Sequence, residues 1–446
     1  MQKLPEKPPS DQSIFFAAPS SDTEFQKIVT EYNNRYLSWD ELKYRIEDPE
    51  RRKQVWGFMK LLREMRYEHI PFRNLDLKYS LIPEIIRGLH TIDRYLSGTI
   101  QIHNKAIRME QSYIINSLME EAISSSILEG AATTRKAAKE MLREGRKPKT
   151  HAEQMVVNNY EALQYILKNK DKPLTRDLIL DVQRIVTANT IEEKSIGKFR
   201  TDNEIVVADS TTGLIYHTPP DFSEIEGFIE EFCTFANDNK IPGKEIADTF
   251  IHPVVKGVLL HYLIGYYHPF NDGNGRTART IFYWFVLARG YWLFEYLAVS
   301  RIILKSRKNY GLAYLYTEYD EDDFTYFLQY NISCIVQALE DLLKFLERKQ
   351  TEQNATKAII RKIEGINQRQ ADILREMMEH SDEYYSIRKI MQLYDVVYQT
   401  ARTDLLELEA QKYIMRHKRG REFLFIFNEN SDLWKKEAKD GKKEIR

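Results

Sequence analysis

The sequence contains little glycine and proline, with 18 glycines and 14 prolines among its 446 residues. Average usage is about 7% glycine and 5% proline, and all-β folds with many turns need at least that much. The shortage therefore disfavours sandwiches and barrels and favours a mainly helical fold. Hydrophobic residues make up 43% of the chain, enough to fill sizeable cores, and the length suggests two or three domains.

Cysteine and net charge are also scarce. Cys233 and Cys334 are the two cysteines of the sequence, and both lie in amphipathic helical patterns. We interpret them as core thiols of a reducing compartment, because two cysteines cannot form a disulfide framework. The 65 basic and 66 acidic side chains leave a net charge of −1. This balance argues against attraction of the whole molecule to nucleic acid or to anionic membrane, so any such surface must be local.

Long apolar runs are missing as well. The first twelve residues, MQKLPEKPPSDQ, contain no apolar segment of the kind found in signal peptides. The longest apolar stretch, Gly257–Asn271, is interrupted by two histidines and is shorter than the roughly 18 to 20 residues of a membrane span. We therefore expect a soluble, cytoplasmic protein with no membrane partner.

Apolar residues recur at helical spacing along most of the chain. After a polar tail over 1–22, the spacing predicts a helical N-terminal domain over 23–100, with a capping-box start at Ser38–Glu41. The same spacing continues from Asn104 to Glu144. Further helices are expected at 151–169, 175–188, 223–238, 245–267 and 276–289, and again through 299–350.

One segment clearly departs from the helical pattern. Glu204–Pro219 contains two runs rich in β-branched residues on either side of Ser210-Thr-Thr-Gly213. Such runs around a glycine-containing turn predict a β-hairpin. We expect a short strand segment inside an otherwise helical region.

The C-terminal part follows a different order. A charged linker helix is expected over 348–367, and residues 368–430 predict three short helices followed by two strands. A charged tail over 431–446 completes the chain. Three helices followed by a basic hairpin are typical of a winged helix-turn-helix domain.

Charge leaves the partner of this domain open. Basic residues gather between Lys412 and Arg421 without an acidic neighbour, which favours duplex DNA as a partner through residues 398–421. The helix at 398–409 also carries three acids, Asp404, Glu407 and Glu409. These favour a protein-contact or homodimer module instead.

The segment His268–Arg279 carries the most chemical information. His268 is a base with a near-neutral ordinary pKa, and Asp272 is a hard oxygen ligand suited to Mg²⁺. The glycines around Asn274 let backbone amides approach a phosphate at the start of a helix. Arg276 and Arg279 are three residues apart, so both can reach one polyanion from one helix face. These features predict a nucleotide-handling site, and a loop of structural glycines between two core helices is the alternative.

This segment resembles the signature of Fic-domain proteins, His-x-Phe-x-Asp/Glu-Gly-Asn-Gly-Arg-x-x-Arg, at every specified position. The resemblance implies a mainly α fold with a Fic-type helical core over 101–347. It also implies that the hairpin at 204–219 is a flap on which a target protein docks as an added strand. The implied activity is protein adenylyltransferase: AMP moves from ATP to a Ser, Thr or Tyr hydroxyl of the target.

The resemblance also assigns roles within the signature. His268 would be the general base, Asp272 would bind Mg²⁺, and Phe270 would be a core anchor. The remaining positions would handle the phosphates of ATP: the anion hole would use the amides of Gly273, Asn274 and Gly275, Arg276 would stabilise the phosphates and Arg279 would hold the γ-phosphate.

A second motif lies upstream, at Ser125-Ser-Ile-Leu-Glu129-Gly130. It resembles the inhibitory helix motif of many Fic proteins, which implies that Glu129 pairs with Arg279 and prevents productive ATP binding. On the residues alone, a solvated Ser–Glu pair followed by a glycine cap is the ordinary interpretation. Two alternatives to AMP transfer also remain: a Fic enzyme that uses another nucleotide or removes AMP, and a transcriptional regulator that senses nucleotide without turnover.

Other residues have simpler interpretations. His217, His252 and His261 lack partners at metal-ligand spacing, so we expect core or surface histidines. We expect Tyr283, Trp284 and Phe285 to fill the core.

Overall fold

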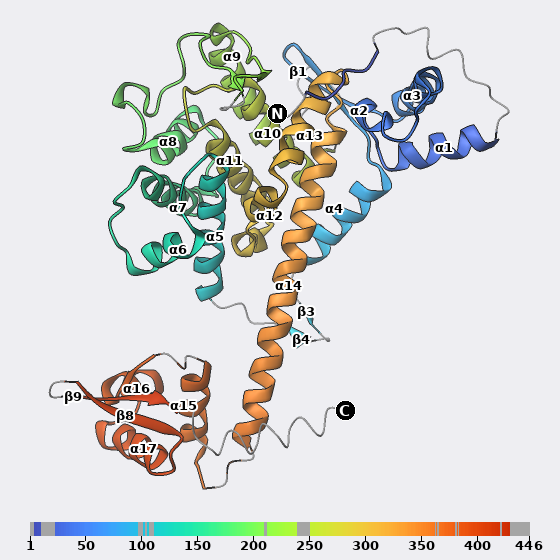
Figure 1. The fold of residues 1–446 in the computed structure, drawn as a ribbon. Helices are drawn as coiled ribbons and strands as arrows, with labels where there is room; N and C mark the ends of the chain where they lie inside the picture. Colours follow the sequence, from blue (N-terminus) through green and yellow to red (C-terminus); the bar gives the residue numbers. More distant parts are fainter. Residues whose placement is uncertain are drawn as a thin grey trace. The chain divides into compact units, whose positions relative to one another are not determined.

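The computed structural model describes residues 4–9, 23–96, 101–102, 105–106, 111–208, 212–238, 250–361, 363, 365–379, 381, 383–419 and 422–428. The chain divides into two compact units, Met1–Leu342 and Leu343–Arg446. The predicted mainly helical fold is confirmed (Figure 1). The finer division into six segments remains a prediction. Within the described ranges, no helix combines the length and the apolar character that crossing a membrane requires.

The N-terminal part begins with α1 (Thr23–Asn34), α2 (Trp39–Leu42) and α3 (Pro49–Glu64). The predicted capping box is confirmed, because the Ser38 amide donates to Glu41 at 2.9 Å and the Glu41 amide donates to the Ser38 hydroxyl at 3.4 Å. Apolar side chains of the three helices pack into one small core, built from Phe25, Val29, Leu37, Trp39, Leu42, Ile46, Val55, Trp56 and Met59.

The prediction that this domain is entirely helical is wrong, because the domain also contains a β-hairpin. Strands β1 (Glu68–Phe72) and β2 (Leu75–Tyr79) pair antiparallel, with Phe72 opposite Leu75, and α4 (Pro83–Leu96) follows. The buried apolar side chains alternate along both strands, which is the strand period. Phe72 packs edge-on against aromatic rings of α9 and α10, so tertiary contacts favour strand here.

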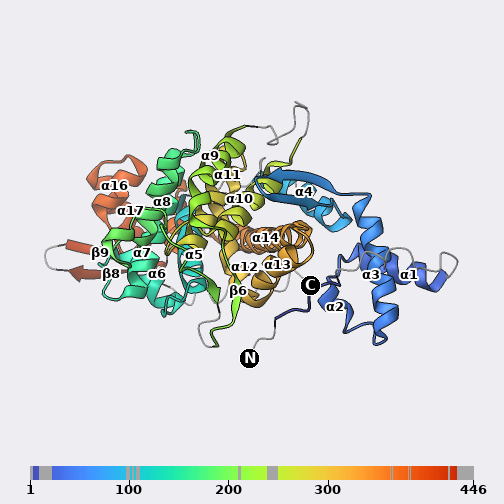
Figure 2. The same ribbon diagram turned by 90° about the horizontal axis from the view of Figure 1, so that it is seen from above.

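The rest of the first unit is a helical bundle, and its last helix continues beyond Leu342 into the second unit. Short strands β3 (Gln101–Ile102) and β4 (Lys105–Ala106) precede it. The helices are α5 (Gln111–Leu128), α6 (Arg135–Glu144), α7 (His151–Asn169), α8 (Arg176–Thr187), α9 (Ile225–Asn237), α10 (Pro253–Tyr267), α11 (Asn274–Ala288), α12 (Val299–Lys305), α13 (Arg307–Tyr319) and α14 (Thr325–Arg361), with 3-10 turns η2 (Glu193–Ser195), η3 (Phe222–Glu224) and η4 (Trp292–Tyr296). Figures 1 and 2 show α10 and α11 in the middle, between α5, α7 and α8 on one side and α12 and α13 on the other.

Two helix boundaries differ from the prediction. Helix α10 begins at Pro253 and not at 245, because Pro253 occupies the first helical position and the His252 side chain accepts the Val254 amide at 3.2 Å. Residues 245–249 lie outside the described residues. The helical spacing predicted from Asn104 to Glu144 belongs to two helices, because Gly130, with a φ of 92°, follows the end of α5 and Thr134 caps α6.

The predicted hairpin at 204–219 is confirmed in its described part. Strands β5 (Val207–Ala208) and β6 (Ile215–His217) pair antiparallel with a bulge at β5. Residues 209–211 of its turn lie outside the described residues. We call residues 204–219 the flap.

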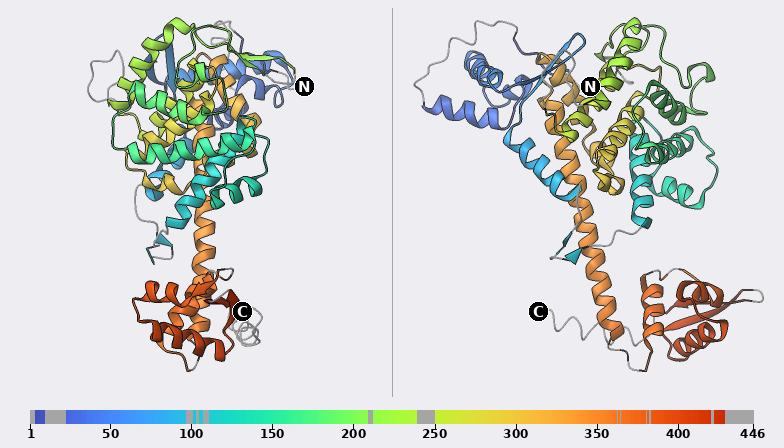
Figure 3. Two further views of the ribbon diagram at one scale, coloured as in Figure 1. Left: turned by 90° about the vertical axis from the view of Figure 1, so that its left-hand side faces the viewer. Right: turned by 180° about the vertical axis from the view of Figure 1, so that it is seen from behind.

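The second unit has the predicted winged-helix order. After the end of α14 come α15 (Gln368–Glu379), β7 (Tyr385–Ser386), α16 (Ile387–Tyr394), α17 (Tyr398–Ala410), β8 (Ile414–Arg419) and β9 (Glu422–Phe427). The short strand β7 was not predicted and extends the hairpin into a sheet ordered β7-β9-β8. Figure 3 shows the helices and the hairpin of this unit, coloured orange to red, from two further sides. The linker helix predicted at 348–367 is the end of α14, which stops at Arg361. The predicted strand Lys412–His417 begins two residues later, at Ile414, and extends to Arg419.

Candidate active site

The loop between α10 and α11 has its shape fixed by one side chain. Asn274 donates from Nδ2 to the Phe270 carbonyl at 2.7 Å and accepts the Phe270 amide on Oδ1 at 3.0 Å. The Phe270 ring is fully buried and stacks on Phe199, with ring centroids 5.3 Å apart. The two hydrogen bonds of Asn274, which we call the loop clip, and the buried Phe270 ring together hold residues 270–274 in one conformation.

His268 ends α10 in the left-handed region, at φ 45°. Its Nδ1 lies 2.9 Å from the Gly265 carbonyl, an acceptor, so Nδ1 carries the proton and Nε2 keeps its lone pair. Burial lowers the pKa of His268 below the ordinary histidine value. A neutral imidazole with its Nε2 lone pair free is the form that a general base needs.

The start of α11 is built to receive an anion. Gly273 caps the helix at φ 83°, and a Cβ at this position would lie 2.8 Å from Cγ2 of Thr187. The first amides of a helix have no acceptor within the helix, and they carry its partial positive charge. The amides of Asn274, Gly275 and Arg276 are therefore available to phosphate oxygens.

Asp272 and Arg276 form an ion pair beside this turn. Arg276 Nη2 lies 3.2 Å from Oδ1 of Asp272, and Nη1 donates to the Val186 carbonyl at 2.5 Å. The Arg276 guanidinium is almost fully buried and its Nε has no partner among the described residues. The Asp272 side chain is 50% exposed, so it can still take a cation on its solvent side.

The second arginine is held by the upstream motif. Arg279 donates from Nε to the Ser125 hydroxyl at 2.8 Å and from Nη2 to the Ser125 carbonyl at 3.1 Å. Nη2 also lies 2.8 Å from Oε1 of Glu129. The pair therefore joins α5 to α11 across 150 residues of sequence.

Glu129 also covers the amide turn. A Cβ at Gly275 would lie 2.2 Å from Oε1 of Glu129, so only a glycine lets the carboxylate come this close to the helix start. Burial alone would raise the pKa of Glu129, but Arg279, Arg276 and His268 together hold it below the ordinary value. The carboxylate thus lies, ionised, where an anion would bind.

The comparisons with known proteins agree with this geometry. Residues 173–286, which include the flap and the whole segment from His268 to Arg279, match the model of the Fic/DOC family. The chain contains a Fic domain. Residues 369–424 match the model of the DeoR-like helix-turn-helix domain, in agreement with the winged-helix order of the second unit.

Relatives of the Fic domain include two curated proteins. The protein adenylyltransferase Fic of Nematostella vectensis is 31% identical over 126 residues, covering 27% of this chain and 25% of that protein. The protein of the same name from Aedes aegypti is 26% identical over 182 residues, covering 40% and 32%. The chain thus spans about a quarter to a third of the length of these relatives.

A solved structure shares the fold. A Fic family protein from Desulfovibrio desulfuricans aligns with a TM-score of 0.52 and 17% identity. The alignment covers 79% of this chain and 98% of that one. At this identity the likeness shows the fold of the Fic domain and its surroundings.

The structure brings all the predicted site residues together at the start of α11. It also refines two of them. The Asn274 side chain is engaged in the loop clip, so only its backbone amide faces an anion, and the Arg276 guanidinium is tied to Val186 and Asp272. Phe270 is the predicted core anchor, and Tyr283, Trp284 and Phe285 are buried as expected.

Arg200 positions the Fic-domain loop, a role that was not predicted from the sequence. Its amide donates to the Pro269 carbonyl at 2.9 Å and its Nε donates to the His268 carbonyl at 3.0 Å. Its terminal nitrogens donate to the carbonyls of Asp202, at 2.7 Å, and Pro220. Arg200 is buried and therefore joins the two segments that flank the flap to His268, the proposed general base.

Gln183 is a second residue of the site that was not predicted from the sequence. Its Nε2 donates to the Asp272 carbonyl at 3.2 Å, and its Oε1 accepts the Gly197 amide at 2.5 Å. The sequence feature that points to this contact is Gly197. It adopts a φ of 67° in a turn, and its amide there needs an acceptor, which Gln183 supplies.

The three histidines expected in the core or at the surface have partners within the fold. His261 is buried against the Tyr310 hydroxyl at 2.8 Å, and burial lowers its pKa to about 3. His252 lies 3.0 Å from the Asp93 carboxylate, and His217 lies 3.0 Å from that of Glu318. Across the described ranges, no three histidine, cysteine or acidic side chains gather as metal ligands.

Proposed function

We propose that the protein transfers AMP from ATP to a hydroxyl side chain of a target protein. The observation that supports this most directly is the contact of His268 Nδ1 with the Gly265 carbonyl at 2.9 Å, which leaves Nε2 without a hydrogen-bond partner among the described residues. The Nε2 of His268 accepts the proton of the target hydroxyl as the hydroxyl oxygen attacks the α-phosphorus. The new bond joins that oxygen to phosphorus, the bond between the α-phosphorus and the bridging oxygen breaks, and pyrophosphate leaves.

Positioning and electrostatic stabilisation account for most of the catalysis in such a transfer. The amides at the start of α11 hold phosphate oxygens, and Arg279 meets the γ-phosphate. Asp272 fits Mg²⁺, because its half-exposed carboxylate is a hard oxygen donor beside the proposed phosphate site. The bound ion would neutralise phosphate charge. A single carboxylate suffices here, because Mg²⁺ is usually completed by substrate phosphates and water.

We further propose that Glu129 inhibits this activity. Its carboxylate occupies Arg279 and lies against Gly275, so it takes the positions that two phosphate groups would need. The Arg279 side chain is only 4% exposed, so solvent weakens the pair less than it would weaken a surface pair. A charge-assisted hydrogen bond in such a place changes an affinity by about ten- to a hundredfold.

Comparing the native protein with Glu129→Gly tests this proposal. Incubation with ATP labelled on the α-phosphate and a cell lysate should yield labelled protein, and Glu129→Gly should raise the yield by about ten- to a hundredfold. Adding Arg279→Ala to Glu129→Gly should remove the gain, because the freed site then lacks its γ-phosphate partner. Glu140→Gly, on the neighbouring helix α6, controls for the glycine itself.

Three outcomes would redirect the proposal. Equal labelling of the native and Glu129→Gly proteins, with equal ATP affinity, would make Glu129 an ordinary surface residue. Labelling from another nucleotide, or release of AMP from a modified target, would keep the site but change the substrate. Nucleotide binding without any transfer by Glu129→Gly would favour the sensing regulator.

The flap fits the proposed docking of a target segment. Val206 and Ile215 are apolar side chains with 39% and 50% of their surface exposed. Strands β5 and β6 form a two-stranded sheet, and no other described strand pairs with either of them, so an extended segment can add to an edge by backbone hydrogen bonds.

A second proposal concerns the winged helix, which we propose binds duplex DNA through residues 398–421. The three acids of α17 that favour a protein-contact module have partners within the second unit. Asp404 is buried and accepts from Arg369 at 2.5 Å, Glu407 accepts from Gln370 at 2.5 Å, and Glu409 pairs with Arg416 at 3.1 Å. The exposed start of α17 is left to uncharged and basic side chains, namely Tyr398, Gln399, Arg402 and Thr403.

Salt dependence tests this second proposal. Each neutralised phosphate contributes about −0.9 to the slope of log affinity against log salt concentration. Arg402→Gln should weaken binding and reduce the slope by about one. Arg375→Gln, on α15, is the matched control and should change neither. Absence of binding to a broad pool of duplexes at low salt would favour the protein-contact or homodimer module.

A further inference from the structure

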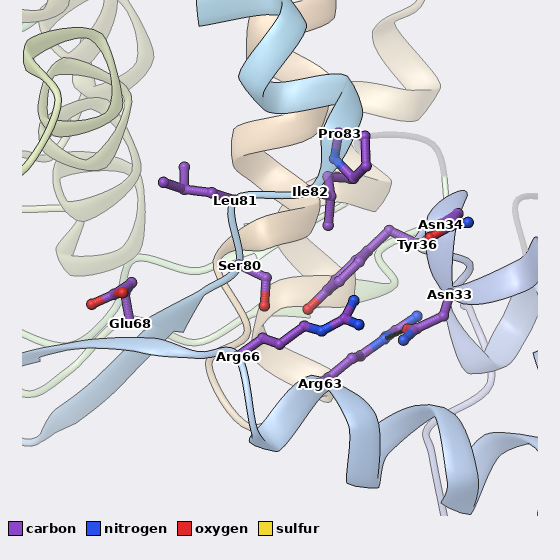
Figure 4. A pocket seen from close by; sticks show the side chains of 10 residues that line it. All are labelled: Asn33, Asn34, Tyr36, Arg63, Arg66, Glu68, Ser80, Leu81, Ile82 and Pro83. Atoms are coloured by element: carbon purple, nitrogen blue, oxygen red, sulfur yellow. Dashed lines mark hydrogen bonds between the residues drawn. The ribbon is translucent and has the colours of Figure 1, made fainter. Parts of the chain in front are cut away.

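A cavity of about 330 Å³ lies in the first unit, and no residue of the Fic signature lines it. Figure 4 shows its wall, formed by the end of α1, the end of α3, the start of β1 and the connection from β2 to α4. Its lining residues are Asn33, Asn34, Tyr36, Arg63, Arg66, Glu68, Ser80, Leu81, Ile82 and Pro83. Its volume falls at the small end of the range of ligand sites, about 300 to 1,000 Å³.

The floor of the cavity is a fixed positive charge. Arg63 is 1% exposed, and its three nitrogens donate to acceptors on Asn33 at 2.7 Å, Tyr326 at 2.7 Å and the Leu37 carbonyl at 2.9 Å. Its guanidinium lies over the ring of Tyr36, 3.9 Å from the centroid. This arginine cannot swing away, so the charge stays at the wall of the cavity.

Two carboxylates beside this arginine do not themselves line the cavity. Asp320 lies 3.7 Å from Nη1 of Arg63 and also accepts from Lys60 at 2.9 Å and from the Tyr326 hydroxyl at 2.8 Å. Asp323 accepts from the hydroxyls of Tyr36 and Tyr67, both at 2.7 Å. The two carboxylates therefore contact Arg63 and Tyr36 of the lining and balance the buried cations.

Two polar side chains of the lining have no hydrogen-bond partner among the described residues. The Ser80 hydroxyl is buried, in a residue only 4% exposed. The Arg66 guanidinium belongs to an exposed residue, and Figure 4 shows it extending into the cavity beside Ser80 and Tyr36. Buried polar groups are nearly always paired, so the unpaired Ser80 hydroxyl beside an unpaired cation indicates a missing acceptor.

We propose that this cavity binds a small organic anion. Arg66 and the Ser80 hydroxyl would donate to a carboxylate or phosphate head, with the Arg63 charge behind them. The Tyr36 ring and the apolar side chains of Leu81, Ile82 and Pro83 would contact a short apolar or aromatic body. Glu68 lies on the same lining and limits the ligand to one anionic end.

Calorimetric titration of the full-length protein tests the proposal, with phenyl phosphate, benzoate and inorganic phosphate as probes at constant ionic strength. An organic anion should bind more tightly than inorganic phosphate, because it also fills the apolar wall. Arg66→Gln should weaken binding about tenfold or more, and Ser80→Ala should weaken it by a smaller factor. Arg51→Gln, an arginine on α3 away from the cavity, is the matched control and should bind like the native protein.

The Fic site could also take an anion, so the same titration is repeated with Arg279→Ala. Binding that survives Arg279→Ala and is lost with Arg66→Gln places the anion in the cavity. Binding lost with Arg279→Ala but not with Arg66→Gln places it at the Fic site and overturns the proposal. No binding by the native protein would overturn it as well. Arg66 is exposed and unpaired among the described residues, so its substitution should leave the fold intact.

Discussion

The signature loop and the flap lie against the same arginine but are held very differently. In the loop, Asn274 binds both backbone groups of Phe270, and Gln183 holds the Asp272 carbonyl. In the described part of the flap, Arg200 fixes the two ends and His217 fixes β6. The contrast fits the proposed roles: groups that act on phosphate need one geometry, whereas a strand that accepts different target segments can adjust.

The largest effect should come from removing the base. In the Glu129→Gly protein, His268→Ala should lower AMP transfer by about 10² to 10⁴, the usual contribution of a general base. ATP affinity should change little, because in the proposed mechanism His268 meets the target hydroxyl and not the phosphates. Single-turnover assays with labelled ATP measure the rate.

His252→Asn is the matched control for this prediction. His252 lies at the opposite end of α10, and asparagine can replace its capping bond to the Val254 amide. The control should keep the full rate. A His268→Ala protein as fast as its parent would exclude His268 from the mechanism.

A smaller effect should follow from breaking the loop clip. Asn274→Ala leaves the buried amide and carbonyl of Phe270 without partners, and each should cost about 1 to 3 kcal/mol in the free energy of unfolding. Ile215→Ala, on the half-exposed face of the flap, should change it by only about 0.5 kcal/mol or less. Denaturant titrations of both variants compare the two regions directly. Equal losses would mean that the loop is no more tightly held than the flap.

The same two regions show what sequence reasoning can reach. Residue types and spacing from His268 to Arg279 were enough to predict a base, a carboxylate, an amide turn and two arginines at one helix start. The spacing could not show that the Asn274 side chain closes the loop, because its partners are the backbone groups of Phe270. Arg200 was hidden for the same reason: its acceptors are carbonyls, which every residue has.

The missed hairpin β1–β2 has a different cause. Its alternation is visible in the sequence, but the same residues also fit a helical spacing. Contacts with residues distant in the sequence decide between strand and helix, because Phe72 packs on Phe228, Phe235 and Tyr267. Those contacts exist only once the chain has folded.

The smallest predicted effect concerns the hydrogen bonds by which His217 anchors β6 of the flap. The strength of this anchoring depends on pH. Nδ1 of His217 lies 3.0 Å from Oε2 of Glu318, and Nε2 lies 2.7 Å from the Tyr266 carbonyl. Both neighbours are acceptors, so both nitrogens donate only when His217 is protonated. Burial alone would lower the pKa of His217, but the carboxylate and the carbonyl raise it above the ordinary value.

The direction of the pH effect follows from this shift. Because the folded-state pKa is raised, the anchoring is complete below the ordinary histidine pKa and is lost as pH rises through the raised value. Hydrogen exchange of β6, corrected for the intrinsic pH dependence, should therefore accelerate above that point, by about tenfold for one charge-assisted bond. His217→Gln keeps one donor for the Tyr266 carbonyl but carries no charge, so its exchange should lack the step. The amides at the start of α11 should show no such step in either protein, and a step there would mean that the loop and the flap loosen together.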